Sequence, residues 1–300
     1  MDMGLCDCSE KALSLAEVRN LLEINIRKDA KLYFGVNDND WVKHVTDNWF
    51  NDQENYDGRW KLIKERIPKV GRVLDMASGC GTFLLYGLHN EYDVWGIEPE
   101  EWKREYFRKK VIASKYPEKY LYRVVAGVGE ALPFENESFD LVTTYQTLEH
   151  VSDVNRCIQE MLRVLKQEGI LYVKAPDYNC FFEPHYRVPF LPKMNKKLAS
   201  VYLKLIRRPL LGLQDLQWIT EKEVIKFLED SKYKLKIERT KDYRFFMRQR
   251  KIKELLPKLL QNMLIISFVN YIYETKAKLI KLAMIGRIEN NIDLWITKVG

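Results

Sequence analysis

The segment from Arg72 to Leu88, RVLDMASGCGTFLLYGL, constrains the fold of this chain more than any other. A short apolar run ends at Asp75, a loop of small residues follows, and a second apolar run begins after Gly81. Glycines in such a loop permit tight turns and let a ligand approach the backbone, while the free N–H groups of the following helix face that ligand. The segment therefore predicts a strand, a ligand-binding loop and a helix.

Strands and helices are expected to alternate around this segment. The expected strands cover residues 72–76, 92–97, 121–126, 139–144, 169–174, 233–240 and 292–298. The expected helices cover residues 10–27, with Ser9 as the cap, then 60–67, 81–89, 100–114, 153–166, 195–207, 220–230 and about 249–285. This order predicts an α/β fold with a doubly wound, mostly parallel sheet and helices on both faces. Ligands bind such sheets at the carboxyl ends of the strands.

Charge and cysteine content restrict the setting in which the chain works. The net charge of +7 and the isoelectric point near 8.9 favour an anionic partner, although an excess of lysine also simply keeps a protein in solution. The five cysteines are scattered, which is typical of a reduced cytoplasmic protein. The first residues hold acids and no apolar core of a signal peptide. No known nucleic-acid-binding module is visible, so no nucleic acid is expected as a partner.

Two carboxylates limit the ligand of the glycine loop. Asp75 ends the first expected strand, and Glu98 ends the next one, 23 residues later. A dinucleotide loop of the form G-x-G-x-x-G would need a third glycine at Leu84, and Asp75 would repel a pyrophosphate. Glu98 can accept both hydroxyls of a ribose. Each acid alone could be only a cap or a turn residue. Together they indicate S-adenosylmethionine, a cationic ligand with a ribose and no pyrophosphate.

Five motifs in order identify a family. They are VLDMASGCG, VWGIEPE, GEALPFENESFDLV, LEHVSD and EMLRVLKQEGILYVKAPD, and with their flanks they span residues 56–176. The chain resembles the class I S-adenosylmethionine-dependent methyltransferases, a family that includes quinone-biosynthesis and bacterial sugar and glycan methyltransferases. The resemblance implies a seven-stranded Rossmann-like sheet. It also implies three parts of one domain: a helical cap over 1–55, a cofactor-binding core over 56–180, and a lid, two last strands and a basic helical insertion over 181–300.

The resemblance also implies a cofactor site for S-adenosylmethionine, with S-adenosylhomocysteine as the product. The residues that would line the methionine and ribose are Asp75, Ala77, Gly79, Gly81 and Glu98. Those beside the adenine would be Gly129, Glu130 and Ala131, and those at the methyl end would be Tyr145 and Gln146. Two positions depart from the family: Ala77 replaces a glycine, and Val128 replaces an acid that often contacts the adenine.

His150 and His185 are the candidate catalytic residues. A sugar hydroxyl needs a general base, and a neutral imidazole has a suitable pKa near 6.5. His150 could instead only cap a helix or position its loop. In some quinone-pathway relatives an E-x-x-E-H motif here binds a metal. Because Gln146 replaces the first acid, we expect no metal site.

The expected function is O-methylation of a small-molecule or sugar-containing acceptor, with N- or C-methylation, a non-catalytic scaffold, or a nicotinamide oxidoreductase as alternatives. The aromatic lid FFEPHYRVPFLP could stack on a sugar, with Arg187 pairing an acidic group, or could simply cover the sheet. The segment from Lys241 to Leu260 contains seven basic and two acidic residues, and an apolar run follows it. This predicts either peripheral membrane contact through 241–273 or a packed insertion with a solvated basic face.

Overall fold

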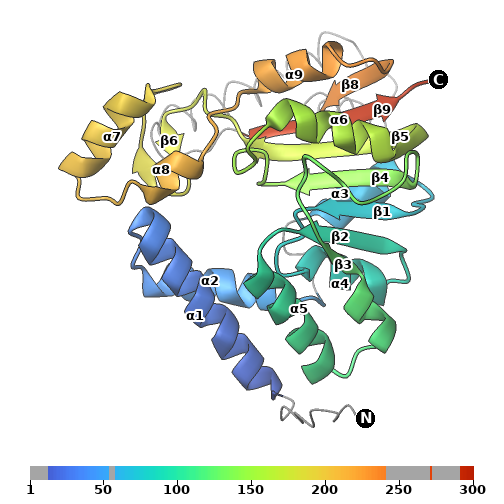
Figure 1. Ribbon diagram of the computed structural model, residues 1–300, viewed down its shortest axis with the longest axis horizontal. Coiled ribbons are helices and arrows are strands. Elements are labelled where there is room, and N and C mark those ends of the chain that lie inside the picture. The colour runs from blue at the N-terminus through green and yellow to red at the C-terminus, as the bar shows by residue number, and fades with distance from the viewer. Residues whose placement is uncertain (1–12, 54–57, 241–270, 272–290) are drawn as a thin grey trace, which may run out of the picture.

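The computed structural model describes residues 13–53, 58–240, 271 and 291–300 (Figure 1). A seven-stranded sheet in the order β3-β2-β1-β4-β5-β9-β8 forms its centre. Its strands are β1 Val73–Met76, β2 Val94–Glu98, β3 Val124–Ala126, β4 Phe139–Tyr145, β5 Leu165–Pro176, β8 Leu235–Arg239 and β9 Asn291–Lys298. Strands β1 to β5 pair in parallel, and β9 runs antiparallel between β5 and β8. The expected doubly wound, mostly parallel seven-stranded sheet is confirmed.

Helices cover both faces of the sheet (Figure 1). Helices α3 Arg59–Arg66, α4 Thr82–His89 and α5 Glu101–Ala113 share one apolar cluster with the sheet. Helices α6 Val154–Val164 and α9 Glu221–Glu229 share another on the opposite face. Outside these layers, α1 Leu15–Phe34 and α2 Asn39–Phe50 pack on α5. A hairpin of β6 Phe182–Glu183 and β7 Val188–Pro189 packs with α7 Lys196–Leu205 and α8 Leu211–Asp215.

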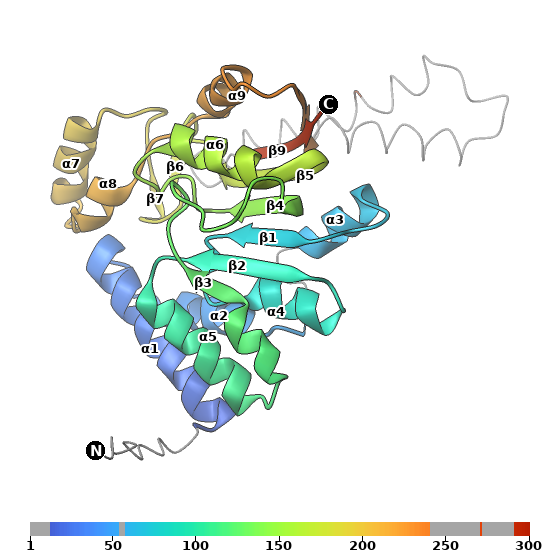
Figure 2. The same cartoon turned by 45° about the vertical axis from the view of Figure 1, so that its right-hand side comes forward.

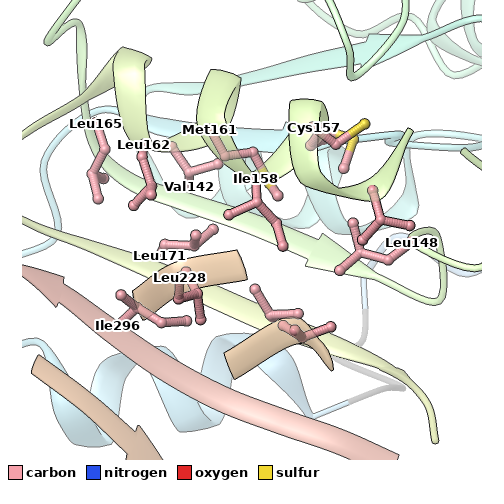
Figure 3. Packing of buried hydrophobic residues seen from close by; sticks show 14 of the residues in the cluster. Val142, Leu148, Cys157, Ile158, Met161, Leu162, Leu165, Leu171, Leu228 and Ile296 are labelled. Carbon is pink, nitrogen blue, oxygen red and sulfur yellow. The ribbon is translucent and has the colours of Figure 1, made fainter. Parts of the chain in front are cut away.

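Helix α6 shows how the sequence pattern produces the core (Figure 3). The side chain of Asp153 caps the helix by accepting a hydrogen bond from the backbone N–H of Arg156 at 3.0 Å. The fully buried stripe of the helix consists of Cys157, Ile158, Met161 and Leu162. These positions recur at helical spacing, so they face Val142 of β4 and Leu171 of β5 together.

Helix α1 differs from its expected range of 10–27. It begins after Ser14, whose side chain forms a capping box with Glu17, and Ser9 lies outside the described residues. It continues to Phe34 because the buried stripe extends past residue 27. Gly35, with φ of 63°, then ends it in the left-handed conformation that glycine adopts without strain.

Three other boundaries also differ. The expected strand 121–126 is wrong in its first half, because residues 118–122 form a 3₁₀ helix (η1, Glu118–Tyr122) in which the hydroxyl of buried Tyr120 donates to the carbonyl of Leu88. Strand β5 begins directly after α6, earlier than expected. The expected helix 249–285 lies almost entirely outside the described residues. No helix among the described residues is long and apolar enough to span a membrane.

Candidate active site

The carboxyl ends of four parallel strands bring the predicted site residues to one edge of the sheet. Strands β1, β2, β4 and β5 end at Met76, Glu98, Tyr145 and Pro176. Figure 2 shows that β1 and β2 point toward the side of the molecule that holds α1 and the β6–β7 hairpin. Because β1 lies between β2 and β4, this edge contains the point where the strand order reverses. Open α/β sheets bind ligands at such a point.

The loop after β1 combines a tight backbone with open space. Ala77, Gly79 and Gly81 all have positive φ, at 59°, 56° and 79°. A Cβ added to Gly79 would meet no atom within 4 Å, whereas one added to Gly81 would lie 2.4 Å from Cδ2 of Phe107. Gly81 therefore allows the loop to approach α5, and Gly79 leaves room for a ligand beside the loop.

Glu98 holds this loop in place. Its Oε2 accepts a hydrogen bond from the backbone N–H of Gly79 at 2.8 Å, and its Oε1 accepts one from the N–H of Glu100 at 3.0 Å. The residue is 2% exposed, and Nζ of Lys103 lies 4.0 Å from Oε1. Since a carboxylate has about four acceptor positions, Glu98 retains the capacity to accept hydrogen bonds from hydroxyl groups of a ligand.

Asp75 has a partner that the sequence analysis missed. Its Oδ1 accepts a hydrogen bond from Nη1 of Arg59 at 2.8 Å, and both side chains are buried. The guanidinium lies 4.0 Å from the ring centroid of Phe83 and 4.7 Å from that of Tyr145. The charge of Asp75 is thus already balanced inside the protein. Asp75 by itself therefore selects a cationic ligand less strongly than we expected from the sequence.

The turn expected beside the adenine, residues 128–131, contains both buried and exposed residues. Gly129 is buried, and packing leaves no room for a side chain there, since a Cβ would lie 2.9 Å from Sγ of Cys157. Oε1 of Glu130 accepts a hydrogen bond from the backbone N–H of Ser152 at 2.8 Å, so this acid fixes the approach to α6. The exposed residues of the turn are Val128 and Ala131.

Gln146 is held by the two strands beyond β4 at the same edge of the sheet. Its φ is 53°, and its backbone N–H donates to the carbonyl of Lys174 at 2.7 Å. Its side-chain amide donates to Oδ1 of Asn291, at the start of β9, at 3.3 Å. The neighbouring Tyr145 packs its ring against Arg59 and Lys174. Gln146 therefore connects β4 to the far half of the sheet.

The two candidate bases lie next to each other. Nε2 of His150 is 3.2 Å from Nε2 of His185, although 35 residues separate them. Nδ1 of His185 is 2.9 Å from Oε1 of Glu183. No sequence motif had indicated Glu183 as a site residue. Below the pair lies Glu149, which is fully buried, with Oε1 3.9 Å and 3.8 Å from the two Nε2 atoms. The fold thus builds a cluster from two segments that were predicted separately.

The surroundings shift the pKa values of this cluster. Burial raises the pKa of Glu149 to about 7. Burial, then the adjacent His185 and Lys103, lower the pKa of His150 below 6.5. His150 is therefore uncharged at neutral pH. The charge of Lys103, whose Nζ lies 4.0 Å from Oε1 of Glu98, is thus also felt at His150.

A cavity of about 540 Å³ opens between the α1–α2 turn and the β6–β7 hairpin. It is lined by Gly35, Val36, Asn37, Asp38, Phe182, Arg187 and Arg208. Arg187 donates to Asp38 at 2.8 Å and so joins the hairpin to the α1–α2 turn. The ring of Phe34, next to the lining, lies 5.2 Å from that of His185. The volume suits a small molecule.

Comparison with known proteins identifies the core of the chain. Residues 74–173 match the family model described as "Methyltransferase domain". The chain is 29% identical over 189 residues to an uncharacterized protein of Methanocaldococcus jannaschii, covering 63% of this chain and 77% of that protein. It is 30% identical over 129 residues to a ubiquinone/menaquinone biosynthesis C-methyltransferase of Geotalea daltonii, covering 41% and 54%. The chain spans between 38% and 54% of the length of the relatives that are named methyltransferases.

Solved structures share the fold. A phosphoethanolamine N-methyltransferase 2 of Haemonchus contortus, in complex with S-adenosyl-L-methionine, superposes with a TM-score of 0.51 at 12% identity, covering 91% of this chain and 60% of that chain. A putative sarcosine dimethylglycine methyltransferase of Galdieria sulphuraria gives 0.50 at 12% identity, covering 94% and 98%. At this identity the likeness concerns the fold alone.

Proposed function

Because the chain carries a class I S-adenosylmethionine-dependent methyltransferase domain, we propose that it methylates a hydroxyl oxygen of a small molecule, such as a sugar or glycolipid. The observation that carries this proposal is the contact between His150 and His185, with Glu183 hydrogen-bonded to the second ring. A sugar hydroxyl is a poor nucleophile and needs a proton acceptor. An imidazole that a carboxylate aligns is suited to that role.

The residues around the glycine loop fit the cofactor of the family. Gly79 faces open space, and Glu98 keeps acceptor positions that ribose hydroxyls can use. When bound, S-adenosylmethionine supplies an electrophilic methyl group on a sulfonium. The chain aligns the acceptor oxygen with that group, and such positioning can be worth roughly 7–11 kcal/mol. The proton of the acceptor then passes to Nε2 of His185, because the lowered pKa of His150 makes that imidazole the weaker proton acceptor.

The cavity beside the hairpin supports a polar acceptor. Arg187 and Arg208 contribute two guanidinium groups to its lining, against one carboxylate from Asp38. Guanidinium groups bind carboxylates and phosphates through paired hydrogen bonds. Phe182 adds an aromatic face on which a sugar ring can pack. We therefore favour an acceptor that combines a sugar or similar polyol with an acidic group.

Methylation of carbon is the second candidate. One relative that is named a C-methyltransferase, from Geotalea daltonii, is 30% identical to this chain. A phenol or a quinol carbon needs less help from a base than a sugar hydroxyl does. NMR of the methylated product separates the two candidates, because an O-methyl and a C-methyl group differ in chemical shift.

Contact with a membrane surface stays part of the proposal. Seven bases and two acids lie between Lys241 and Leu260, and this segment falls outside the described residues. A basic segment next to apolar residues is attracted to anionic lipid. We propose a cytoplasmic protein that reaches a lipid-linked acceptor in this way. Sedimentation with phosphatidylserine vesicles and with phosphatidylcholine vesicles tests it, and equal recovery with both would contradict it.

The first experiment is a calorimetric titration with S-adenosylhomocysteine, with NADH as the control ligand. We expect one-to-one binding of S-adenosylhomocysteine, no heat with NADH, and loss of binding in Asp75→Asn and Glu98→Ala. Intact binding in both variants would contradict the site. A response to NADH alone would favour the oxidoreductase reading.

The second experiment measures release of S-adenosylhomocysteine with monosaccharides, glycolipids and quinols as acceptors. We expect turnover with a hydroxyl acceptor that falls at least tenfold in His185→Ala. His44→Ala is the matched control, because His44 is an exposed residue of α2 that contacts only Asn48 among the described hydrogen bonds. Turnover that His185→Ala leaves unchanged would remove the histidine pair from the mechanism, and no turnover with any acceptor would favour the scaffold reading.

A further inference from the structure

Three ligand-type atoms meet where the β6–β7 hairpin approaches the segment after β4. Within the described residues, Glu149, His150 and His185 are the group whose histidine and carboxylate atoms all lie within 4.8 Å of one another. The Nε2 atoms are 3.2 Å apart, and Oε1 of Glu149 is 3.9 Å and 3.8 Å from them. A point in the plane of this triangle lies about 2.1 Å from all three atoms. Bonds from zinc to imidazole nitrogen or carboxylate oxygen are roughly 2.0–2.2 Å long.

The burial of Glu149 is an independent observation that indicates a bound cation. Glu149 is 0% exposed, and neither of its carboxylate oxygens has a hydrogen-bond partner among the described residues. Burying an ionised carboxylate without a partner is costly, so such a group takes up a proton, is paired or coordinates a metal. Oε1 faces the two imidazole nitrogens. An ion at the centre of the triangle would satisfy it.

A second layer of contacts orients one of the ligands. Nδ1 of His185 is 2.9 Å from Oε1 of Glu183, which also accepts from the hydroxyl of Tyr178 at 3.1 Å. The other oxygen of Glu183 accepts from the backbone N–H of Tyr186 at 2.6 Å. As these contacts hold the carboxylate, Nδ1 of His185 carries the hydrogen and Nε2 presents its lone pair to the cluster. A carboxylate behind a histidine is the usual support of a metal ligand.

We propose that Glu149, His150 and His185 bind a divalent transition-metal ion of the zinc type. Two imidazole nitrogens and one carboxylate favour such an ion over magnesium or calcium, which prefer oxygen ligands. Three protein ligands leave a coordination position open, as in catalytic zinc sites. We expected no metal site from the sequence because Gln146 replaces an acid, but His185 of the β6–β7 hairpin would supply the third ligand instead.

Such an ion would sharpen the proposed function, on which this step rests. The open position would take an oxygen of the acceptor, and coordination lowers the pKa of a bound hydroxyl. With the ion bound, the Nε2 atoms of both histidines would be ligands, so the proton of the O–H bond would pass to solvent and not to a histidine. The new C–O bond forms as the S–C bond of the sulfonium breaks, and S-adenosylhomocysteine leaves. The acceptor class becomes an alcohol or polyol with an oxygen free to coordinate, and the ion does not change its oxidation state.

The test uses the full chain after removal of metals with a chelator and dialysis. Co²⁺ alone is titrated while the visible absorption is followed, and Zn²⁺ alone is titrated by calorimetry. We expect one ion per chain, and Co²⁺ bands typical of a low-coordinate nitrogen and oxygen site. In Cys6→Ser/Cys8→Ser the result should be unchanged, which excludes the amino-terminal cysteines as the source of binding.

Variants assign the ligands. His185→Ala and Glu149→Gln are expected to weaken Co²⁺ binding more than about 100-fold, and Glu183→Gln about 10- to 100-fold. His44→Ala is the control and should bind as the original chain does. Absence of binding by the original chain, or unchanged binding in His185→Ala, would overturn the proposal. Titration with S-adenosylhomocysteine on the same samples keeps the two proposals apart: loss of metal binding with intact S-adenosylhomocysteine binding refutes only the metal site.

Discussion

The buried ion pair between Arg59 and Asp75 provides a quantitative test of how the first strand is held under the glycine loop. The two groups are 2.8 Å apart, and their side chains are 8% and 2% exposed. Replacing Arg59 with Met keeps most of the apolar stem but removes the cation. The charge of Asp75 would then lie in a region with little water to solvate it. Breaking a buried pair in this way typically costs about 3–5 kcal/mol.

We expect Arg59→Met to lower the free energy of unfolding by about 3 kcal/mol. The matched control is Arg19→Met. Arg19 donates to Asp47 at 2.5 Å, but these side chains are 33% and 52% exposed. Exposed pairs contribute about 0–1 kcal/mol, because solvent screens them. The residue and the substitution are the same in both variants, so the difference reports the effect of burial.

The assay is urea unfolding followed by tryptophan fluorescence, with linear extrapolation to water. A loss below about 1 kcal/mol in Arg59→Met, equal to that of the control, would refute the reasoning. The double variant Arg59→Met/Asp75→Asn should regain part of the loss, since neither charge remains. A double variant that is less stable than the sum of the single changes predicts would also count against an ion-pair origin.

Two further tests concern the loop and the acid stability of the fold. Gly81→Ala should destabilise the protein by about 1–3 kcal/mol, because its Cβ would lie 2.4 Å from Phe107. Gly79→Ala creates no such clash and should cost about 1–2 kcal/mol of backbone strain. We expect it to weaken S-adenosylhomocysteine binding in calorimetry. Equal effects of the two changes on stability and on binding would contradict these different roles of Gly79 and Gly81. Hydrogen bonds from Arg163 lower the pKa of Glu160 below 4.5. The stability that they contribute is complete above that pH and is lost as the pH falls through the lowered value, so Glu160→Gln should flatten the acid side of a stability-against-pH curve.

Most of the fold could be predicted because its signals are local. Strands β1, β2, β4 and β9 lie within a residue or two of their expected ranges, since apolar runs between turn residues record burial directly. The errors arose where tertiary contacts override local preference. Tyr120 bonds to Leu88 and leaves the first half of an expected strand as a 3₁₀ helix. Helix α1 is longer than expected because the rest of the protein covers its later apolar stripe.

The candidate site was predictable only in part. The sequence indicated Asp75, Glu98 and the glycine loop, because strand ends and glycines follow from local pattern. It did not indicate Arg59, whose role depends on where α3 packs. For Gln146, the motif predicted a place at the strand end, but not the hydrogen bond of its side chain to Asn291 on β9. A motif specifies the position of a backbone, whereas the direction of a side chain depends on neighbours that are distant in the sequence.

The sequence by itself determined the alternation of strands and helices, the glycine loop and the ordered motifs that identify a methyltransferase domain. Only the tertiary structure decided that His150 and His185 lie 3.2 Å apart over the buried Glu149. The physical reason is the distance along the chain. The position of His150 follows from the end of β4, but that of His185 depends on a hairpin held by Phe34 of α1 and by its own core. No local preference encodes a contact that three separate segments create by packing together.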